Sequence, residues 1–573
     1  MGPVDHMGQG VRHRSPSRNA ACAVDTSAEG TTTGLLDPVA PLDPVAPLDP
    51  VAPTRPRPAH GADSRPEPST EASVEEEATP GSSRLRRDTG LRASLSRPTS
   101  VLVMASVVAG TAIRLDVPRG LWLDEAVSVS EARMPYGEML HRLATSDVHP
   151  PLYFTFLWAS IRLLGHGEFA VRAPSILFGV ILIPLVYLLG KEAYDRKTGA
   201  LVSIIVAVAP FTVWYSQEAR MYSQLMVFAV LALWAQLRVL RRGGWFPWAV
   251  YAVSSVAMIA TQYFGIWQLV AQQLIFVVVI VSRWRRHRRP PALLRGWLCT
   301  ALPMAAAAAP LALLMKQQFS IDQATGQAFG VAANAGFGTT SVYSVIANVV
   351  DATIGFHSTA VITDVSSFWP FAMLAALALL GRRARSVTYL LVMVVVIPFI
   401  GMFVLAEFKG SLGDVRYLST TVPVLLLFLA RGVTTLATGR RLLAVVVGAL
   451  VGVLVIALVD QQFSATNPRR FDFREALQRV DAEARPGDRI LFDPVNVELN
   501  TVTTYYSPEV NASPLTPIPS VVTGHTTFIV VSQALMGASD RATLYSALGA
   551  LNFVHKRAAQ HWVFPNVDVW VYR

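Results

Sequence analysis

Long apolar segments joined by short polar connections constrain this chain more than any other feature. A helix needs about 20 apolar residues, with a range of roughly 17–25, to cross the hydrocarbon core of a bilayer. Charged residues make up only 15% of the chain, against about 25% in a soluble domain. We therefore predict a mainly α-helical, polytopic membrane bundle. Its eleven candidate spans, the first and tenth of which are short, are Thr99–Ile113, Val171–Gly190, Ala200–Tyr215, Leu225–Leu240, Trp245–Thr261, Ile266–Ser282, Leu298–Met315, Val365–Gly381, Val387–Ala406, Tyr417–Ala430 and Leu442–Val459.

Basic residues in alternate connections indicate how the spans are oriented. Cytoplasmic loops carry an excess of Lys and Arg. With a cytoplasmic N-terminus, five connections lie inside, and all five contain basic residues: 191–199, 241–244, 283–297, 382–386 and 431–441. The segment between the first two spans and the C-terminal region then lie outside. We expect the short apolar stretch Pro150–Gly165 to be a helix in the outer interface, because a crossing there would reverse every later loop.

The two ends of the chain differ from this bundle, which we place at residues 98–460. Residues 1–97 are rich in Pro, Ser, Thr and Ala and include three copies of Leu-Asp-Pro-Val-Ala-Pro; such a composition predicts a disordered cytoplasmic tail. Residues 461–573 read as a small extracytoplasmic α/β domain. Its predicted elements are a helix over Asp472–Ala484, strands at Arg489–Phe492 and Thr526–Ser532, a helix over Arg541–Leu551 and a strand at Val567–Tyr572.

Composition also argues against several function classes. The net charge is +10, but the basic residues cluster beside apolar runs, so nucleic-acid binding explains them poorly. The two cysteines, Cys22 and Cys299, give no disulfide framework and no thiolate metal site. The sequence shows no phosphate-binding loop. It indicates no cofactor, and a divalent metal ion is left open.

Four features on the outer side could form one site. They are the pair Asp124 and Glu125, the run that begins at His149, the segment carrying Glu218, Arg220 and Tyr222, and the segment carrying Lys409, Arg416 and Tyr417. Carboxylates can act as general acid or base, and cations are what a lipid phosphate requires. Each feature alone has a structural interpretation: Asp124 as a helix cap, His149 as a hydrogen-bonding residue, and Arg220 and Arg416 as interfacial anchors.

The runs Leu121–Glu125, His149–Tyr153, Glu168–Ser175 and Tyr215–Tyr222, in that order, resemble the GT-C membrane glycosyltransferases. The similarity is greatest to bacterial proteins like the protein O-mannosyltransferases and lipid A aminoarabinose transferases (families 39 and 83), and it covers roughly residues 100–435. It implies a polyprenyl-phosphate sugar donor, an extracytoplasmic active site in the bacterial plasma membrane, and inversion at the anomeric carbon.

The resemblance also implies roles for the site residues. Asp124 matches the acid that serves as catalytic base, and we group Glu125 and Glu218 with it as catalytic residues. The expected donor-binding and phosphate-binding residues are His149, Arg220, Tyr222, Lys409, Arg416 and Tyr417. The acceptor would be an envelope glycan, a glycolipid or a protein.

Two other functions remain open at the level of sequence. A membrane transporter or lipid flippase would explain the spans and the glutamines in Ile266–Ser282, although transporters more often place charges at mid-span and show repeated halves. An inactive scaffold with an outer binding domain is the other. The sequence leaves the sugar and the acceptor undetermined.

Overall fold

The computed structural model describes residues 98–289, 291–325, 349–355, 361–380, 385–409, 415–437, 439–465, 467, 469–492, 499–515, 525–532, 542–548 and 560–572. The predicted N-terminal tail and part of the Val365–Gly381 span lie outside these residues. So do the side chain of Lys409 and part of the predicted helix Arg541–Leu551, which is helical over residues 542–548.

Helices occupy all eleven places where the apolar runs predicted spans. They are α2 (Pro98–Leu115), α6 (Glu168–Ala193), α7 (Arg196–Val208) with α8 (Pro210–Ser216), α9 (Tyr222–Arg242), α10 (Trp245–Thr261), α11 (Gly265–His287), α12 (Ala292–Thr325), α15 (Val361–Leu380), α16 (Arg385–Lys409), α17 (Val422–Leu436) and α18 (Arg440–Phe463). Within the described part of the chain, seven helices are long and apolar enough to cross a membrane, or eight if α7 and α8 form one bent span. The protein is thus a multi-pass membrane protein.

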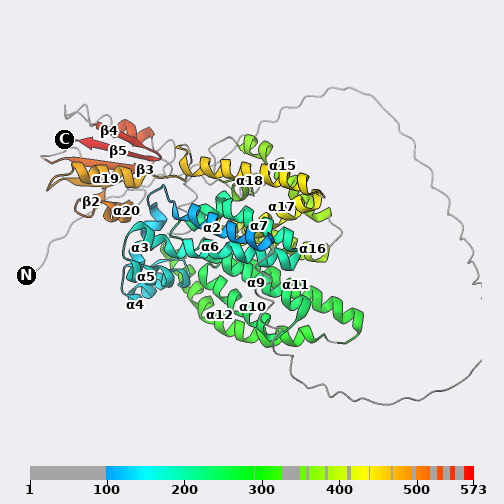
Figure 1. The fold of residues 1–573 in the computed structure, drawn as a ribbon. Coiled ribbons are helices and arrows are strands. Elements are labelled where there is room, and N and C mark those ends of the chain that lie inside the picture. Colours follow the sequence, from blue (N-terminus) through cyan, green and yellow to red (C-terminus); the bar gives the residue numbers. More distant parts are fainter. Residues whose placement is uncertain are drawn as a thin grey trace, which may run out of the picture. The chain divides into compact units, whose positions relative to one another are not determined.

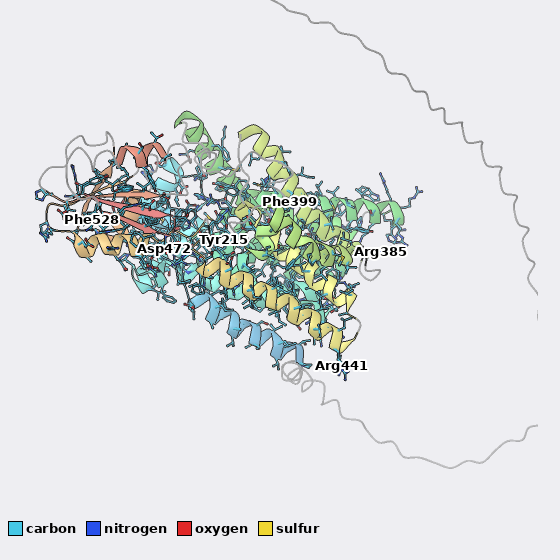
Figure 2. All side chains as sticks on the ribbon, turned by 90° about the horizontal axis from the view of Figure 1, so that it is seen from above. Tyr215, Arg385, Phe399, Arg441, Asp472 and Phe528 are labelled. Atoms are coloured by element: carbon cyan, nitrogen blue, oxygen red, sulfur yellow. The ribbon has the colours of Figure 1, made fainter. Side chains whose placement is uncertain are left out.

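The helices form one bundle (Figure 1), in which α6 packs against both α7 and α9. Arg385 begins α16 and Arg441 lies in the first turn of α18, and both were assigned to the same side of the membrane from the loop charges. Figure 2 shows these two residues at the same end of the bundle.

The expected continuous span Ala200–Tyr215 is wrong, because the helix breaks at Ala209 and bends by 59°. Pro210 lacks a backbone N–H and disfavours a helical conformation at the residue before it. Arg114 of α2 is fully buried at this break, where its guanidinium donates to the carbonyl oxygens of Val206 and Ala207, each at 3.0 Å. It therefore satisfies carbonyl groups that the break leaves without helical partners.

The long connection between the first two spans contains three short helices, α3 (Leu123–Ala132), α4 (Tyr136–Ser146) and α5 (Leu152–Leu164). The last confirms a helix within Pro150–Gly165; its 13 residues fall short of a spanning length. The helix-cap interpretation of Asp124 is wrong, because the N-cap of α3 is Trp122 and Asp124 lies inside the first turn. The predicted start of the tenth span at Tyr417 is also wrong: residues Val415–Leu418 form the 3-10 helix η1, and α17 begins at Val422.

The C-terminal region forms a five-stranded mixed sheet with strand order β2-β1-β3-β5-β4. Its elements are α19 (Phe473–Glu483), β1 (Arg489–Phe492), α20 (Leu499–Tyr506), β2 (Asn511–Pro514), β3 (Thr527–Ser532), β4 (Gln560–Phe564) and β5 (Val567–Tyr572). Strands β1, β2 and β3 run parallel, and β5 is antiparallel to β3 and β4. Figure 2 shows Phe528 of β3 among these strands. The α/β prediction is confirmed, with α20, β2 and β4 added to it.

The sheet region and the first loop share a hydrophobic core. Leu123 and Ala126 of α3 are buried in the same cluster as Phe473 and Leu477 of α19. The hydroxyl of Tyr506 on α20 accepts a 2.6 Å hydrogen bond from the backbone N–H of Leu121. Consequently the segment that begins α3 is held from two directions, by the helical bundle and by the C-terminal region.

Candidate active site

Asp124 and Glu125 are neighbours in the sequence but occupy different environments. The carboxylate of Asp124 is 22% exposed and pairs with Arg416, whose Nη1 lies 2.8 Å from Oδ2. Nη2 of Arg220 lies 3.6 Å from the same oxygen. A carboxylate, one arginine from the turn after α8 and another from η1 thus meet at a partly open position.

Glu125 is fully buried, and its carboxylate is saturated with donors. Oε1 accepts from Nε of Arg172 at 2.8 Å and from the backbone N–H of Ala219 at 2.7 Å. Oε2 accepts from Nη2 of Arg172 at 2.8 Å and from the backbone N–H of Trp122 at 3.1 Å. Such a bidentate pair fixes the orientation of both groups. Glu125 therefore joins the start of α3, helix α6 and the turn after α8, and has little capacity left for a substrate.

Arg172, which the sequence did not single out as a site residue, extends this connection. Its guanidinium also donates to the backbone carbonyls of Arg119 and Gly120, at 2.9 and 2.8 Å. Glu168, one helical turn earlier on α6, accepts from Arg172 at 3.2 Å. The sequence shows that Glu168 and Arg172 are four residues apart and can pair on one helix. It does not show that Arg172 also pairs with Glu125, which lies 47 residues earlier in the chain.

Glu218 lies in the turn between α8 and α9 and is 3% exposed. Its Oε2 atom is buried without a hydrogen-bond partner. Burial raises the pKa of Glu218 to about 7, and the nearby carboxylate of Glu125 adds to the rise, while Arg119 opposes it. Burial therefore favours the protonated form of this carboxyl group.

Arg220 reaches three groups from the same turn. Besides its approach to Asp124, it donates from Nη1 to the hydroxyl of Ser128 at 2.9 Å, and its Nη2 lies 3.0 Å from Nε2 of His149. Nδ1 of His149 is in turn 2.6 Å from Asp147. Ser128 and Asp147 had no place among the predicted site residues.

The remaining predicted residues divide into those close to this centre and one that is not described. The Arg416 guanidinium lies over the rings of Trp122 and Tyr417, at 5.9 and 5.4 Å from their centroids. The Tyr417 ring also packs on Phe264 at 4.4 Å. Tyr222 is buried at the start of α9, near the charges of Arg416 and Arg220. Lys409 ends α16, and its side chain is not among those described.

Buried polar atoms without partners gather around this centre. In the described part of the chain they include Nε1 of Trp122, Oε2 of Glu218 and Nε of Arg220. A buried polar group without a partner is unfavourable and indicates a place that a ligand or water completes. Among the same described residues, no group of three or more His, Cys, Asp and Glu side chains is placed to hold a metal ion.

Comparison with known proteins places this site in a family context. The family model of dolichyl-phosphate-mannose-protein mannosyltransferases matches residues 148–312. ArnT from Cupriavidus metallidurans, solved bound to undecaprenyl phosphate, aligns with a TM-score of 0.52 at 13% identity and covers 82% of this chain and 97% of its own. The chain thus resembles the GT-C membrane glycosyltransferases in part of its sequence and in its fold.

Other structural comparisons are more distant. The apo structure of the same ArnT aligns at 12% identity with a TM-score of 0.49, covering 84% of this chain and 98% of that one. The oligosaccharyltransferase AglB from Archaeoglobus fulgidus, solved with an inhibitory peptide and a dolichol-phosphate, aligns at 12% identity with a TM-score of 0.43, covering 83% and 74%. Comparison with curated protein sequences gives no significant match. The family match favours the enzyme over the transporter and scaffold alternatives.

Proposed function

We propose that this protein is a glycosyltransferase that transfers a sugar from a polyprenyl-phosphate donor to a hydroxyl of an extracytoplasmic acceptor, with inversion at the anomeric carbon and Asp124 as general base. The observation that carries the proposal is the meeting of Asp124 with Arg416 and Arg220, at 2.8 and 3.6 Å. These residues combine a proton acceptor with two guanidinium groups suited to a phosphate. The ArnT structure with undecaprenyl phosphate supports a lipid phosphate as the ligand class.

The two arginines have a direct part in this reaction. Without a donor, Arg416 is paired with Asp124 and occupies its carboxylate. A donor phosphate competes for Arg416 and Arg220 and draws them away from Asp124. Donor binding therefore releases the base at the same time as it fixes the sugar. An enzyme of this design does not activate an acceptor until the donor is in place.

The chemical step is a single displacement. The acceptor hydroxyl gives its proton to Asp124, and its oxygen forms a bond to the anomeric carbon from the side opposite the phosphate. The bond between the anomeric carbon and the phosphate oxygen breaks, and polyprenyl phosphate leaves with the electron pair. Arg416 and Arg220 stabilise the negative charge that grows on the leaving phosphate.

The two glutamates take different parts. Glu125 is saturated by Arg172 and two backbone N–H groups, so we assign it to holding the first turn of α3 in place. Glu218 has an unpartnered carboxyl oxygen and a pKa raised to about 7 by burial, so it can take up the proton that Asp124 receives and release it after transfer. Tyr222 and Tyr417 line the centre close to the arginines.

The basic connections support an active site on the outer side of a bacterial plasma membrane, with the N-terminus inside and the C-terminal region outside. The acceptor would be an envelope glycan, a glycolipid or a protein. The pattern of loop charges that motivates this orientation includes Arg385 and Arg441, at one end of the bundle.

Transfer from defined donors tests the proposal. Purified full-length protein in lipid nanodiscs is given synthetic polyprenyl-phosphate hexoses and pentoses with an envelope extract, and released polyprenyl phosphate is measured by mass spectrometry. We expect release with at least one donor, loss of release in Asp124→Asn, and normal release in the control Asp116→Asn, whose side chain is exposed just after α2. Release from no donor, or full release in Asp124→Asn, contradicts the proposal.

A further inference from the structure

One face of α3 is polar along its whole length. Asp124, Ser128 and Glu131 follow each other at spacings of four and three residues, so their side chains lie on the same side of the helix. Asp124 and Ser128 both contact Arg220, at 3.6 and 2.9 Å. Glu131 lies close to Asp147, in the connection between α4 and α5, and its Oε2 atom is buried without a hydrogen-bond partner. This face of α3 therefore contacts Arg220 and lies next to residues 147–149.

His149 connects these two partners of α3 through both of its ring nitrogens. Nδ1 lies 2.6 Å from Oδ1 of Asp147, and Nε2 lies 3.0 Å from Nη2 of Arg220. A guanidinium group can only donate hydrogen bonds. Nε2 must therefore carry a lone pair, so the ring proton is on Nδ1 and is donated to Asp147. These contacts define one tautomer of a neutral imidazole.

The groups behind His149 stabilise that tautomer. The carboxylate of Asp147 also accepts the backbone N–H of Val148 at 2.5 Å, so it is fixed in place to accept the Nδ1–H of His149. Burial raises the pKa of Glu131 to about 9, and the negative charge of Asp147 adds to the rise. At neutral pH Glu131 thus carries a proton that it can share with Asp147, which remains the charged acceptor for His149.

We propose that His149 is a positioning residue: as a neutral acceptor it holds Arg220 at the donor phosphate, and Asp147 with protonated Glu131 keeps its proton on the far nitrogen. This assignment differs from direct phosphate binding, because neither ring nitrogen is left for a ligand. It rests on the proposed function only for the identity of the ligand that Arg220 meets.

Protonation of His149 reverses the contact. An Nε2–H would face the Arg220 guanidinium, donor against donor and charge against charge, and would drive Arg220 out of place. The charged and titratable groups that face this cluster are Asp124 and Glu131 on α3, Arg142 on α4, Arg220 after α8 and Tyr263 after α10. The side chain of Gln318 on α12 donates to the backbone carbonyl of His149 and is neutral. Acidification should therefore weaken donor binding through His149.

The first experiment reads the tautomer without any assay of transfer. Full-length protein is labelled with 15N-histidine, and the His149 signals are obtained by solid-state NMR as the difference between the native protein and His149→Gln. At neutral pH we expect one protonated nitrogen, Nδ1, and one nitrogen with a free lone pair, Nε2. In Asp147→Asn the proton should be divided between the two nitrogens. A proton on Nε2 in the native protein overturns the inference, whatever the enzyme transfers.

The second experiment measures the KM for the donor as a function of pH. A glutamine carbonyl can accept from Arg220 but cannot take up a proton. His149→Gln should therefore raise KM at neutral pH less than His149→Leu does, and it should lose the further rise in KM at acidic pH. His149→Leu should raise KM by roughly tenfold to a hundredfold, the range for a lost hydrogen bond to a charged group, with a smaller effect on kcat. The control is His141→Gln, whose side chain is exposed on α4.

The two experiments separate this inference from the proposed function. Absence of transfer by the native protein contradicts the proposed function, and the NMR result still decides the role of His149. Transfer with an unchanged acidic rise in KM in His149→Gln contradicts the positioning role alone. Because Asp147 acts through His149, Asp147→Asn should raise KM in the native background and have little further effect in His149→Gln. Equal effects in both backgrounds also contradict the role.

Discussion

Replacement of Glu125 by Gln should damage the stability of the protein more than any other conservative change in the site. The side chains of Arg172 and Glu125 are 1% and 0% exposed. Gln keeps the size of the side chain but removes its charge and turns one oxygen into an NH2 group. Whichever oxygen is lost, one nitrogen of Arg172 and one backbone N–H lose their acceptor.

The expected loss of stability in Glu125→Gln follows from the burial of the Glu125–Arg172 pair. Removing one partner of a buried ion pair leaves an uncompensated charge and costs about 3–5 kcal/mol. Unfolding entropy is roughly 2 cal/mol/K per residue, so the ~480 residues after the N-terminal tail give about 1 kcal/mol/K. A shift of roughly 3–5 °C in the unfolding temperature is therefore expected. Because solubilised membrane bundles lose only part of their structure on heating, the observed shift should be at least this large.

Thermal unfolding in one detergent, followed by tryptophan fluorescence, measures the shift. The matched control is Glu138→Gln on α4, where the side chain is exposed. Replacing both partners by apolar residues, Glu125→Leu with Arg172→Met, should be less destabilising than either single change, since no buried charge is then left alone. A native unfolding temperature in Glu125→Gln, or additive effects in the double variant, would refute the reasoning.

Four further predictions follow from the same contacts. Asp124→Asn should reduce transfer by at least ~10²–10⁴-fold with an unfolding temperature close to native, because the carboxylate is partly exposed and Asn retains its size; near-normal turnover of a synthetic donor would remove Asp124 as base. Arg416→Ala should raise the KM for the donor by roughly tenfold or more, and Arg416→Lys should restore it only in part; kinetics that leave KM unchanged would place the phosphate elsewhere. The folded-state pKa of Glu218, about 7, exceeds its ordinary value of 4.5, so this group opposes folding increasingly as pH rises through that window; Glu218→Gln should therefore lose less stability than the native protein between pH 5 and 8, and parallel melting curves would contradict this. Deletion of residues 1–80 should leave membrane insertion and transfer intact; loss of either in a membrane-fraction assay would show that the tail is needed.

The sequence predicted the positions of the spans well, because an apolar run of spanning length has few alternatives in a lipid environment. The prediction failed at the third span, because mean hydropathy over a window does not detect a local break in the helix. Pro210 was visible in the sequence, but the apolar residues on both sides concealed the break at Ala209. Strand β2, Asn511–Pro514, has no apolar alternation and ends in proline. It is tolerated because it forms an edge of the sheet.

The proximity of the candidate site residues was more predictable than their roles, which stay predictions. Asp124, Arg220 and Arg416 were expected together and do meet. The sequence could not show which of Asp124 and Glu125 faces the two arginines of the site. Adjacent residues of a helix always project on different sides, but only the packing of the helix decides which side each neighbour occupies. Arg172 was missed for a related reason: a charged side chain in an apolar span has no visible partner until the fold brings Glu125 beside it.

The shared core of α3 and α19 has a consequence for how the enzyme is made and how it can be changed. The segment that carries Asp124 is completed by residues synthesised hundreds of positions later, including Phe473 and Tyr506. A chain that stops before residue 470 lacks α19 and α20, so α3 is left without the part of its core that these helices supply. The same contacts limit chimaeras between related proteins. A C-terminal region taken from a relative should support transfer only when the loop around Leu121 is taken from the same relative.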